Sequence, residues 1–269
     1  MSLISPFFRN IKFVGREANV KSTRSKFDEK EMRIFSFLSK RSFRILDSII
    51  CQSNDMIQDF KKSMEIDESK FLVINNPITD GFTYKEKLPR NDEVIRYITV
   101  GTLHKRKGHE RILRILSNVD HPFHYTIIGN GKELALIEKL ISELKLSKCV
   151  QHVPYTKEVP RYLEESDLFL NGSYVEGFPN VLIESCAVGT PVVAFDAPGG
   201  INEIIKEGLN GYIVHTEDEY IKKLNEINAD NTFESKSVSD SVISRYGKNI
   251  IIEKYEKLFK DLVKGNPIK

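Results

Sequence analysis

The sequence has little net charge, few cysteines and no long apolar run. Its 40 Lys and Arg residues nearly balance 38 Asp and Glu residues, and the net charge of +2 excludes a protein built as a whole to coat nucleic acid. The three cysteines, Cys51, Cys149 and Cys186, form no Cys-x-x-Cys pair, which indicates a reducing compartment rather than a disulfide framework. No stretch approaches the roughly 20 apolar residues that span a bilayer. The opening MSLISPFFRNIKF is too polar for a signal peptide, so we expect a cytoplasmic protein.

Several motifs that indicate a particular chemistry are also missing. The chain has no Gly-x-x-x-x-Gly-Lys-Ser/Thr loop and no Gly-x-Ser-x-Gly elbow to carry a serine nucleophile. Its six histidines include no His-x-x-x-His pair, and no Asp-x-Asp occurs. A metal-dependent mechanism therefore has no visible ligands, and we expect neither a metal site nor a bound cofactor.

Beyond residue 96, short apolar segments alternate with helical patterns in a chain of 269 residues, long enough for one or two domains. The expected strands are 97–100, 124–128, 150–153, 168–171, 192–195 and 211–214, and the expected helices are 109–119, 134–144, 158–165, one beginning at 180, 201–207, 220–227 and 235–263. This alternation predicts an α/β fold with a Rossmann-type doubly wound parallel sheet. Ligands bind such sheets at the carboxyl ends of the strands.

The first part of the chain has an alternation of its own. Strands are expected at 11–14, 48–51 and 71–75, and helices at 29–46 and 54–64, the second with Ser53 or Asn54 as its cap. The stretch 78–93 lacks periodicity and is the best candidate for a domain boundary. Near the C-terminus, NIIIEKYEKLFKDLV presents an apolar stripe that needs a cover. Packing within the same chain is favoured over a partner helix.

Two glutamates bracket the stretch GSYVEGFPNVLIESCAVGTP, with seven residues between Glu176 and Glu184. If Asn180 begins a helix, the amides from Phe178 to Leu182 are free donors, and such a helix N-terminus binds anions. An ionised glutamate accepts hydrogen bonds from sugar hydroxyls. The pattern favours a ligand that combines phosphate and sugar. The alternative is that Glu176 only caps the helix and Glu184 is solvated.

A basic loop, Gly-Thr-Leu-His-Lys-Arg-Lys-Gly at 101–108, follows the first strand of the large sheet. Cations at the start of a helix oppose its dipole, so Arg106 and Lys107 are more useful to an external phosphate, which they would hold by charge-assisted hydrogen bonds. The alternative is a solvated turn. Gly129-Asn-Gly131 is a weak signal by itself, since most such triplets are turns. All three segments should converge on one edge of the sheet.

From 98 to 214 the chain resembles the donor domain of retaining glycosyltransferases of family four, which adopt the GT-B fold. The matching stretches are VGTLHKRKGHERIL, FHYTIIGNGKE, VQHVPYTKEVPRYLEESDLFLNGSYVEGFPNVLIESCAVGTPVVAFDAPGGINEII and NGYIV. SIICQSNDM and VINNPI resemble the last two strands of the family's acceptor domain, and KYEKLF resembles its C-terminal crossover helix. The resemblance implies a partial acceptor-side α/β domain at 1–84, a donor-binding domain at 85–245, and a helix at 246–269 that packs back toward the first domain.

The resemblance also implies roles for individual residues. Lys107 would contact the donor diphosphate, Glu176 would hold the transferred sugar or its leaving side, and Glu184 would bind the ribose. Glu176 and Lys107 are therefore the expected catalytic residues, since preorganised donors and cations stabilise a departing diphosphate without a metal. The other residues expected at the donor site are Gly101, Thr102, Arg106, Gly129, Val153, Tyr155, Gly177, Phe178, Pro179, Asn180, Val181 and Leu182, of which the segment 153–155 would flank the base and the amide of Leu182 would touch phosphate.

Two positions depart from the family pattern. Thr102 stands where most members have an arginine beside the lysine, so Arg106 is expected to substitute for it. The acceptor-side loop at 16–19 is Arg-Glu-Ala-Asn where the family often has Arg-Glu-His-Asn. Arg16 and Glu17 are therefore expected on the acceptor side, and the histidine's role does not carry over.

The resemblance covers only the end of an acceptor domain. Against a usual domain of about 150 residues, roughly 90 residues would precede Met1 in a full-length member. A remnant of two or three strands would leave an exposed sheet edge, which proteins normally cover or pair. We therefore expect poor solubility or a partner chain over residues 1–77.

The expected function is retaining transfer of a sugar from a UDP- or GDP-sugar to a saccharide or lipid-linked acceptor, in bacterial surface polysaccharide or lipopolysaccharide biosynthesis. Within residues 1–27, six basic residues against one acid leave a charge of +5, which favours contact with the inner face of the membrane. Solvation, or lining of an acceptor cleft, is the alternative for these cations. The alternative functions are a nucleotide-sugar-binding fragment, half of a split enzyme, or another enzyme on the same fold, such as an epimerase or a phosphorylase.

Overall fold

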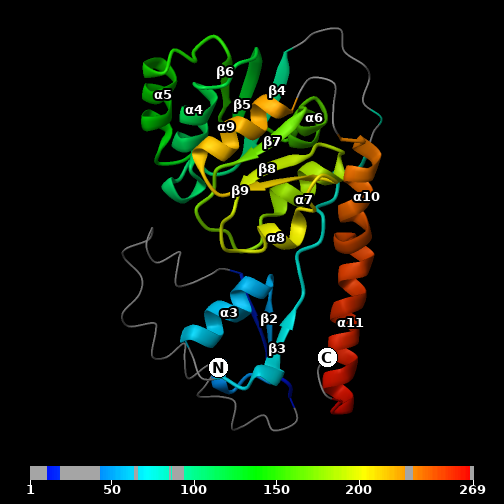
Figure 1. Ribbon diagram of the computed structural model, residues 1–269. Helices are drawn as coiled ribbons and strands as arrows, with labels where there is room; N and C mark the ends of the chain where they lie inside the picture. The colour runs from blue at the N-terminus through cyan, green and yellow to red at the C-terminus, as the bar shows by residue number, and fades with distance from the viewer. Residues whose placement is uncertain are drawn as a thin grey trace.

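The computed structural model describes residues 11–18, 43–63, 66–84, 86, 94–227 and 233–266. Two parallel sheets lie one above the other in Figure 1. The larger sheet has six strands in the order β6-β5-β4-β7-β8-β9, and the smaller has three in the order β1-β2-β3. The predicted α/β fold with a doubly wound parallel sheet and a second α/β unit is confirmed, whereas the interpretation of the second unit as partial stays a prediction.

The six strands of the large sheet form where the short apolar segments were expected. They are β4 (Ile95–Val100), β5 (Phe123–Ile128), β6 (Val150–Val153), β7 (Leu168–Asn171), β8 (Val192–Phe195) and β9 (Gly211–Val214). Every residue of β7 and β8 is buried, because helices cover both faces of a parallel sheet and leave no strand face for polar residues. The strand order reverses between β4 and β7, and the crevice at such a reversal is where doubly wound sheets bind ligands.

The helices around the large sheet fall into two groups. They are α4 (His109–Leu116), α5 (Leu134–Glu143), α6 (Val159–Glu164), α7 (Asn180–Ala187), α8 (Ile201–Ile204), α9 (Glu217–Glu226) and α10 (Ser235–Tyr246). Helices α9 and α10 follow the last strand of the sheet, and the others connect its strands. Helix α4 contacts α5 and α9, whereas α7 contacts α6 and α10. Right-handed crossovers that run in opposite directions from a switch point place their helices on opposite faces, so each group covers one face.

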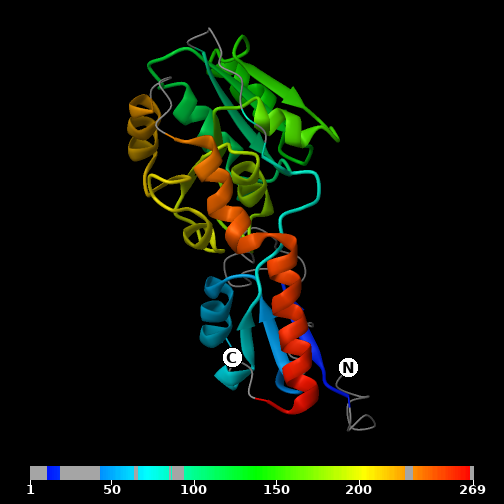
Figure 2. The same cartoon turned by 90° about the vertical axis from the view of Figure 1, so that its right-hand side faces the viewer.

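The small sheet is covered by the last helix of the described chain. It consists of β1 (Val14–Glu17), β2 (Ser48–Cys51) and β3 (Phe71–Val73), with α3 (Asn54–Ser63) and the short η2 (Glu68–Lys70) between its second and third strands. Helix α11 (Lys248–Lys264) runs back along this sheet in Figure 2. Its Ile251, Leu258 and Leu262 form one buried cluster with Ile50 and Ile74. The amphipathic C-terminal segment therefore packs within the same chain.

Several boundaries differ from the sequence-based expectation, among them the end of α4 at Leu116 instead of 119 and the start of α9 at Glu217 instead of 220. The first strand was placed at 11–14 but lies at Val14–Glu17, because pairing with the buried β2 extends the strand through polar residues. Helix α8 ends at Ile204 instead of 207. The reason is the Asn210 side chain, whose Oδ1 accepts from the Lys206 amide at 2.7 Å and whose Nδ2 donates to the Ile204 carbonyl at 3.1 Å. The expected helix 235–263 is interrupted at Gly247, whose ψ of 143° is extended.

Some expectations lie mostly outside the described residues, including the helix at 29–46 and the basic stretch at 1–27. The division at residues 84 and 245 stays a prediction. None of the helices within the described ranges is both long enough and apolar enough to cross a membrane. The three cysteines are free thiols.

Candidate functional site

The basic loop after β4 forms a short helical turn, η3 (Lys105–Lys107), that faces the loop after β7. His104 begins the turn, and its Nδ1 accepts from the Arg106 amide at 3.2 Å. Gly108 ends it with a φ of 61°, and a Cβ there would lie 1.9 Å from the Gly172 carbonyl oxygen. Only glycine permits both this backbone conformation and this close approach. The Tyr174 amide also donates to the Arg106 carbonyl at 2.8 Å, so the two loops lie against each other.

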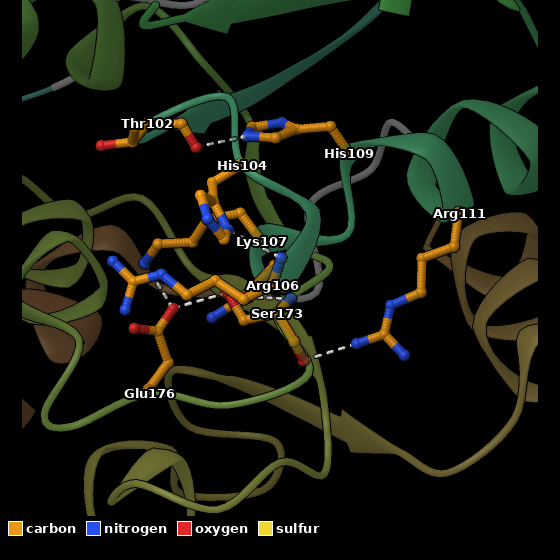
Figure 3. Close-up of polar contacts among 9 residues, drawn as sticks. Thr102, His104, Arg106, Lys107, His109, Arg111, Ser173 and Glu176 are labelled. Carbon is orange, nitrogen blue, oxygen red and sulfur yellow. Dashed lines mark hydrogen bonds and ion pairs between the residues drawn. The ribbon is translucent and has the colours of Figure 1, made fainter. Parts of the chain in front are cut away.

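Glu176 is the polar centre of this junction. Its Oε1 accepts from Lys107 Nζ at 2.6 Å and from Ser173 Oγ at 2.5 Å. Figure 3 shows both donor side chains directed at the carboxylate. The Glu176 side chain is 8% exposed and that of Lys107 is 19% exposed. An ammonium group has three donors, so Lys107 can hold Glu176 and a bound anion at the same time.

Helix α7 begins at Asn180, as predicted, and its N-terminus is open. Its N-cap residue is Pro179, and no side chain caps it, so Glu176 is not a helix cap. In the described part of the chain, no acceptor takes the amides of Phe178, Asn180 and Val181. The Leu182 amide, expected to be free, donates to the Pro179 carbonyl at 3.0 Å, because a tight first turn satisfies one orphan donor. The Leu182 amide is therefore not free in this structure, and its contact with phosphate stays a prediction.

Glu184 lies one turn further along α7, half-buried rather than solvated. Its Oε1 accepts from Thr79 Oγ1 at 2.5 Å. Burial raises the pKa of the Glu184 carboxyl above its ordinary value of 4.5, and the hydrogen bond from Thr79 opposes this shift only in part. A carboxylate held in this way, with an oxygen left over, accepts further hydrogen bonds from a ligand.

The raised pKa of Glu184 predicts a pH-dependent gain in stability for Glu184→Gln. A carboxyl whose pKa is higher in the folded than in the unfolded state makes the protein less stable as pH rises above about 4.5. The glutamine variant loses this penalty, so its Tm should exceed that of the wild type at pH 7 and converge with it below about pH 4. Thermal unfolding across this range measures the difference. A constant offset, or the same offset for the exposed Glu138→Gln, would contradict the assigned cause.

His109 is buried beneath the basic loop. Its Nε2 lies 3.3 Å from the Thr102 carbonyl oxygen, which can only accept, and its Nδ1 has no hydrogen-bond partner among the residues that the structure describes. Burial, assisted by the nearby positive charge of Lys107, lowers the pKa of His109 to about 4. The imidazole is therefore neutral at physiological pH and adds no charge beside Lys107. It supports the backbone of the loop at Thr102, which sequence reasoning did not anticipate.

Arg111 and Ser173 also escaped the sequence analysis. Arg111 Nε donates to the Gly172 carbonyl at 2.5 Å, and its Nη2 donates to the Ser173 carbonyl. Its guanidinium lies over the rings of Tyr174 and Phe195, 4.0 and 3.6 Å from their centroids. Arg111 thus holds the backbone that leads to Glu176. The contact of Ser173 with Glu176 could have been predicted, because the two residues are only three positions apart. The contact of Arg111 with Ser173 spans 62 positions, and no sequence pattern predicts it.

The other loops at this edge meet the basic loop through their backbones. The Leu103 amide donates to Asn130 at 3.0 Å, and the Gly129 amide donates to the carbonyl of Val153 at 2.9 Å. These bonds bring together Gly101, Thr102, Gly129 and Val153, as the sheet topology predicts. Tyr155 follows on the rim, 77% exposed. The contributions of these residues to ligand binding stay predictions.

The two acceptor-side residues lie on β1, and one of them is linked to α7. Arg16 Nη2 donates to the side-chain oxygen of Asn76, and Asn76 Nδ2 donates to Asn180 Oδ1 at 2.6 Å. Glu17 Oε1 accepts from the Ala18 amide at 3.1 Å. The relay places Arg16 two side chains away from the open N-terminus of α7. Among the residues that the structure describes, no group of His, Cys, Asp and Glu side chains could hold a metal ion.

Comparison with known proteins gives one matching family and several relatives. The family described as glycosyl transferases group 1 matches residues 80–244. An uncharacterized glycosyltransferase of Haemophilus influenzae is 27% identical over 82% of this chain and 66% of its own length. The N-acetylgalactosamine-N,N'-diacetylbacillosaminyl-diphospho-undecaprenol 4-alpha-N-acetylgalactosaminyltransferase of Campylobacter jejuni is 27% identical over 68% of this chain and 50% of its own length. The amylovoran biosynthesis glycosyltransferase AmsD of Erwinia amylovora is 29% identical over 66% of this chain and 53% of its own length.

The chain thus spans about half to two thirds of the length of these curated relatives. Solved structures with the same fold cover nearly all of it. Sucrose-phosphate synthase from Thermosynechococcus elongatus superposes with a TM-score of 0.83 at 18% identity, covering 98% of this chain and 72% of the synthase. HepE of Anabaena, solved in complex with UDP, superposes with a TM-score of 0.81 at 18% identity, covering 97% of this chain and 75% of HepE.

Proposed function

Because the chain belongs to the glycosyl transferases group 1 family and has the GT-B fold, we propose that it transfers a sugar from a nucleoside-diphosphate sugar, with retention of configuration. Its acceptor would be a saccharide or a lipid-linked saccharide of a bacterial surface polysaccharide. The names of two relatives support this, since one acts on a diphospho-undecaprenol saccharide and one serves amylovoran biosynthesis. An acceptor of that kind would place the reaction at the cytoplasmic face of the membrane.

The observation that carries this proposal is the open N-terminus of α7 between two carboxylates. The amides of Phe178, Asn180 and Val181 have no acceptor in the described chain, and a helix N-terminus with free N–H groups binds phosphate. Lys107 is held near this N-terminus by its ion pair with Glu176, in which Nζ lies 2.6 Å from Oε1. A diphosphate held there would meet both the helix amides and an ammonium group.

Each side chain then has a distinct part in the transfer. The departing diphosphate carries negative charge, which the amides of α7, Lys107 and Arg106 would stabilise because they are already oriented. Glu176 is fixed through Oε1 by Lys107 and Ser173, which leaves Oε2 to accept from hydroxyls of the sugar. We propose that these groups suffice without a metal or cofactor.

Glu184 would bind the ribose of the nucleotide. Its Oε1 is held by Thr79 at 2.5 Å, and its second oxygen is left to accept from a ribose hydroxyl. The backbone of 153–155 would flank the base, with Tyr155 exposed at its rim. These two roles predict that nucleotide affinity depends on Glu184 and that turnover depends on Glu176.

Calorimetry with UDP and GDP tests the proposal directly. We expect one of the two to bind, and Glu184→Ala to weaken its binding about 10- to 100-fold, the worth of one or two hydrogen bonds to a charged group. The control is Glu138→Ala on the exposed surface of α5, which should leave the affinity unchanged. If neither nucleotide binds, or if the two variants behave alike, this site does not bind the donor.

The second candidate is a nucleotide-sugar-binding fragment that needs another chain for transfer. Tight nucleotide binding without hydrolysis or transfer would support it, and so would light scattering that shows a partner-dependent assembly. Transfer by the purified, monodisperse monomer would exclude it.

A further inference from the structure

Helices α3 and α8 meet with their N-termini facing each other across the junction of the two sheets. Asp55, in the first turn of α3, accepts through Oδ2 from the amides of Gly199 and Gly200 at 2.8 and 3.1 Å. Glu203 of α8 accepts in return from the Asn54 amide at 2.6 Å. Two helix N-termini repel each other through their partial positive charges. Each is neutralised here by a carboxylate from the opposite helix.

The turn that Asp55 holds lies directly against Glu176. The Glu176 amide donates to the Pro198 carbonyl at 2.8 Å. Gly199 has a φ of 122°, and a Cβ there would lie 2.1 Å from the Glu176 carbonyl oxygen. Neither the conformation nor the space admits another residue. A shift of this turn would therefore move the backbone of Glu176.

The small sheet also holds the residues on either side of Glu176. Val175 is buried in one cluster with Ile49, Cys51 and Met56, and Ser53 Oγ donates to the Gly177 carbonyl at 3.2 Å. The Glu176 segment is thus enclosed between the turn at 198–200 and the N-terminal unit. Asp55 is a charged group of the N-terminal unit that binds the turn directly.

We propose that Asp55 is a positioning residue for Glu176, acting through the amides of Gly199 and Gly200. The sugar-transfer site is then completed by the N-terminal unit and is not contained in the large sheet alone. The expected effect of Asp55 on catalysis rests on the function proposed above. Its effect on the position of the Glu176 backbone does not depend on that function. Within the described part of the chain, Asp55 accepts only from the amides of Gly199 and Gly200. Glu184 and the amides of α7 are not among its partners, so we expect its substitution to lower turnover far more than nucleotide affinity.

Asp55→Asn tests this inference, because it keeps the shape but removes the charge that two amides share. In the full-length chain we expect turnover to fall about 10- to 100-fold, as for a small displacement of a catalytic group, while the Kd for UDP or GDP stays within about twofold. Hydrogen exchange of the peptide around Glu176 should become about 10-fold faster, since its amide bond to Pro198 opens more often. The control is Glu68→Gln, which likewise converts a carboxylate to an amide, at a 70% exposed side chain in the N-terminal unit.

Two readouts keep the test decisive. If Asp55→Asn fails to fold, Glu203→Gln breaks the same helix contact from the other side and should speed exchange around Glu176 equally. If the wild type shows no nucleotide binding or turnover, the proposed function fails, but the exchange rates still judge the positioning. Unchanged exchange around Glu176, or loss of nucleotide affinity equal to the loss of turnover, would overturn the inference.

Discussion

Turnover should fall about 100- to 1,000-fold when Glu176 is replaced by glutamine, while nucleotide affinity stays within about threefold. The amide can still accept through one oxygen from Lys107 and Ser173, which hold Glu176 Oε1 at 2.6 and 2.5 Å. The other carboxylate oxygen becomes an NH₂ group, which donates and carries no charge. The variant therefore keeps the local packing but loses the acceptor that we propose binds the sugar. Steady-state kinetics combined with calorimetry separates the two effects.

Glu138→Gln is the matched control, because the same change occurs on the exposed side of α5. It should leave both turnover and affinity unchanged. Equal and small effects from Glu138→Gln and Glu176→Gln would show that the Lys107 and Glu176 pair only maintains the fold. A loss of affinity as large as the loss of turnover would instead assign Glu176 to nucleotide binding.

The large sheet could be predicted almost to the residue, because its strands are short and its central strands β7 and β8 are mostly apolar and fully buried. The segments at β7 and β8 contrast so strongly with the loops around them that composition alone locates their ends. Strand β1 was misplaced for the opposite reason. Its Gly15, Arg16 and Glu17 are poor strand formers, and pairing with β2 across a long stretch of sequence holds them in place.

The site was predictable where its residues follow the ends of strands, and not where it depends on distant contacts. Lys107 and Glu176 could be placed at one sheet edge because each follows a strand beside the switch point. The bond between Thr79 and Glu184 spans 105 positions, and that between Asp55 and Gly199 spans 144. No periodicity encodes such pairs. The occupied Leu182 amide was missed because the geometry of a first helical turn is not visible in composition.

Lys107→Met should destabilise the protein by about 3–5 kcal/mol, because it leaves a carboxylate that is only 8% exposed without its counter-charge. Methionine keeps the length of the side chain, so loss of the ammonium group dominates. Urea unfolding measures the change, and an unaltered m-value would show that only stability has shifted. Lys105→Met is the control, since it removes a charge from an exposed residue of the same turn and should cost less than about 0.5 kcal/mol.

The double variant Lys107→Met/Glu176→Gln separates stability from chemistry. With both charges removed, no buried carboxylate is left unpaired, so most of the stability lost in Lys107→Met should return. Diphosphate binding and turnover should not return, because neither the cation nor the sugar acceptor is restored. The two substitutions would then couple strongly in unfolding and not in catalysis. If the two changes in unfolding free energy simply add, Lys107 stabilises the protein independently of Glu176. That result would contradict the ion pair as the central interaction of the site.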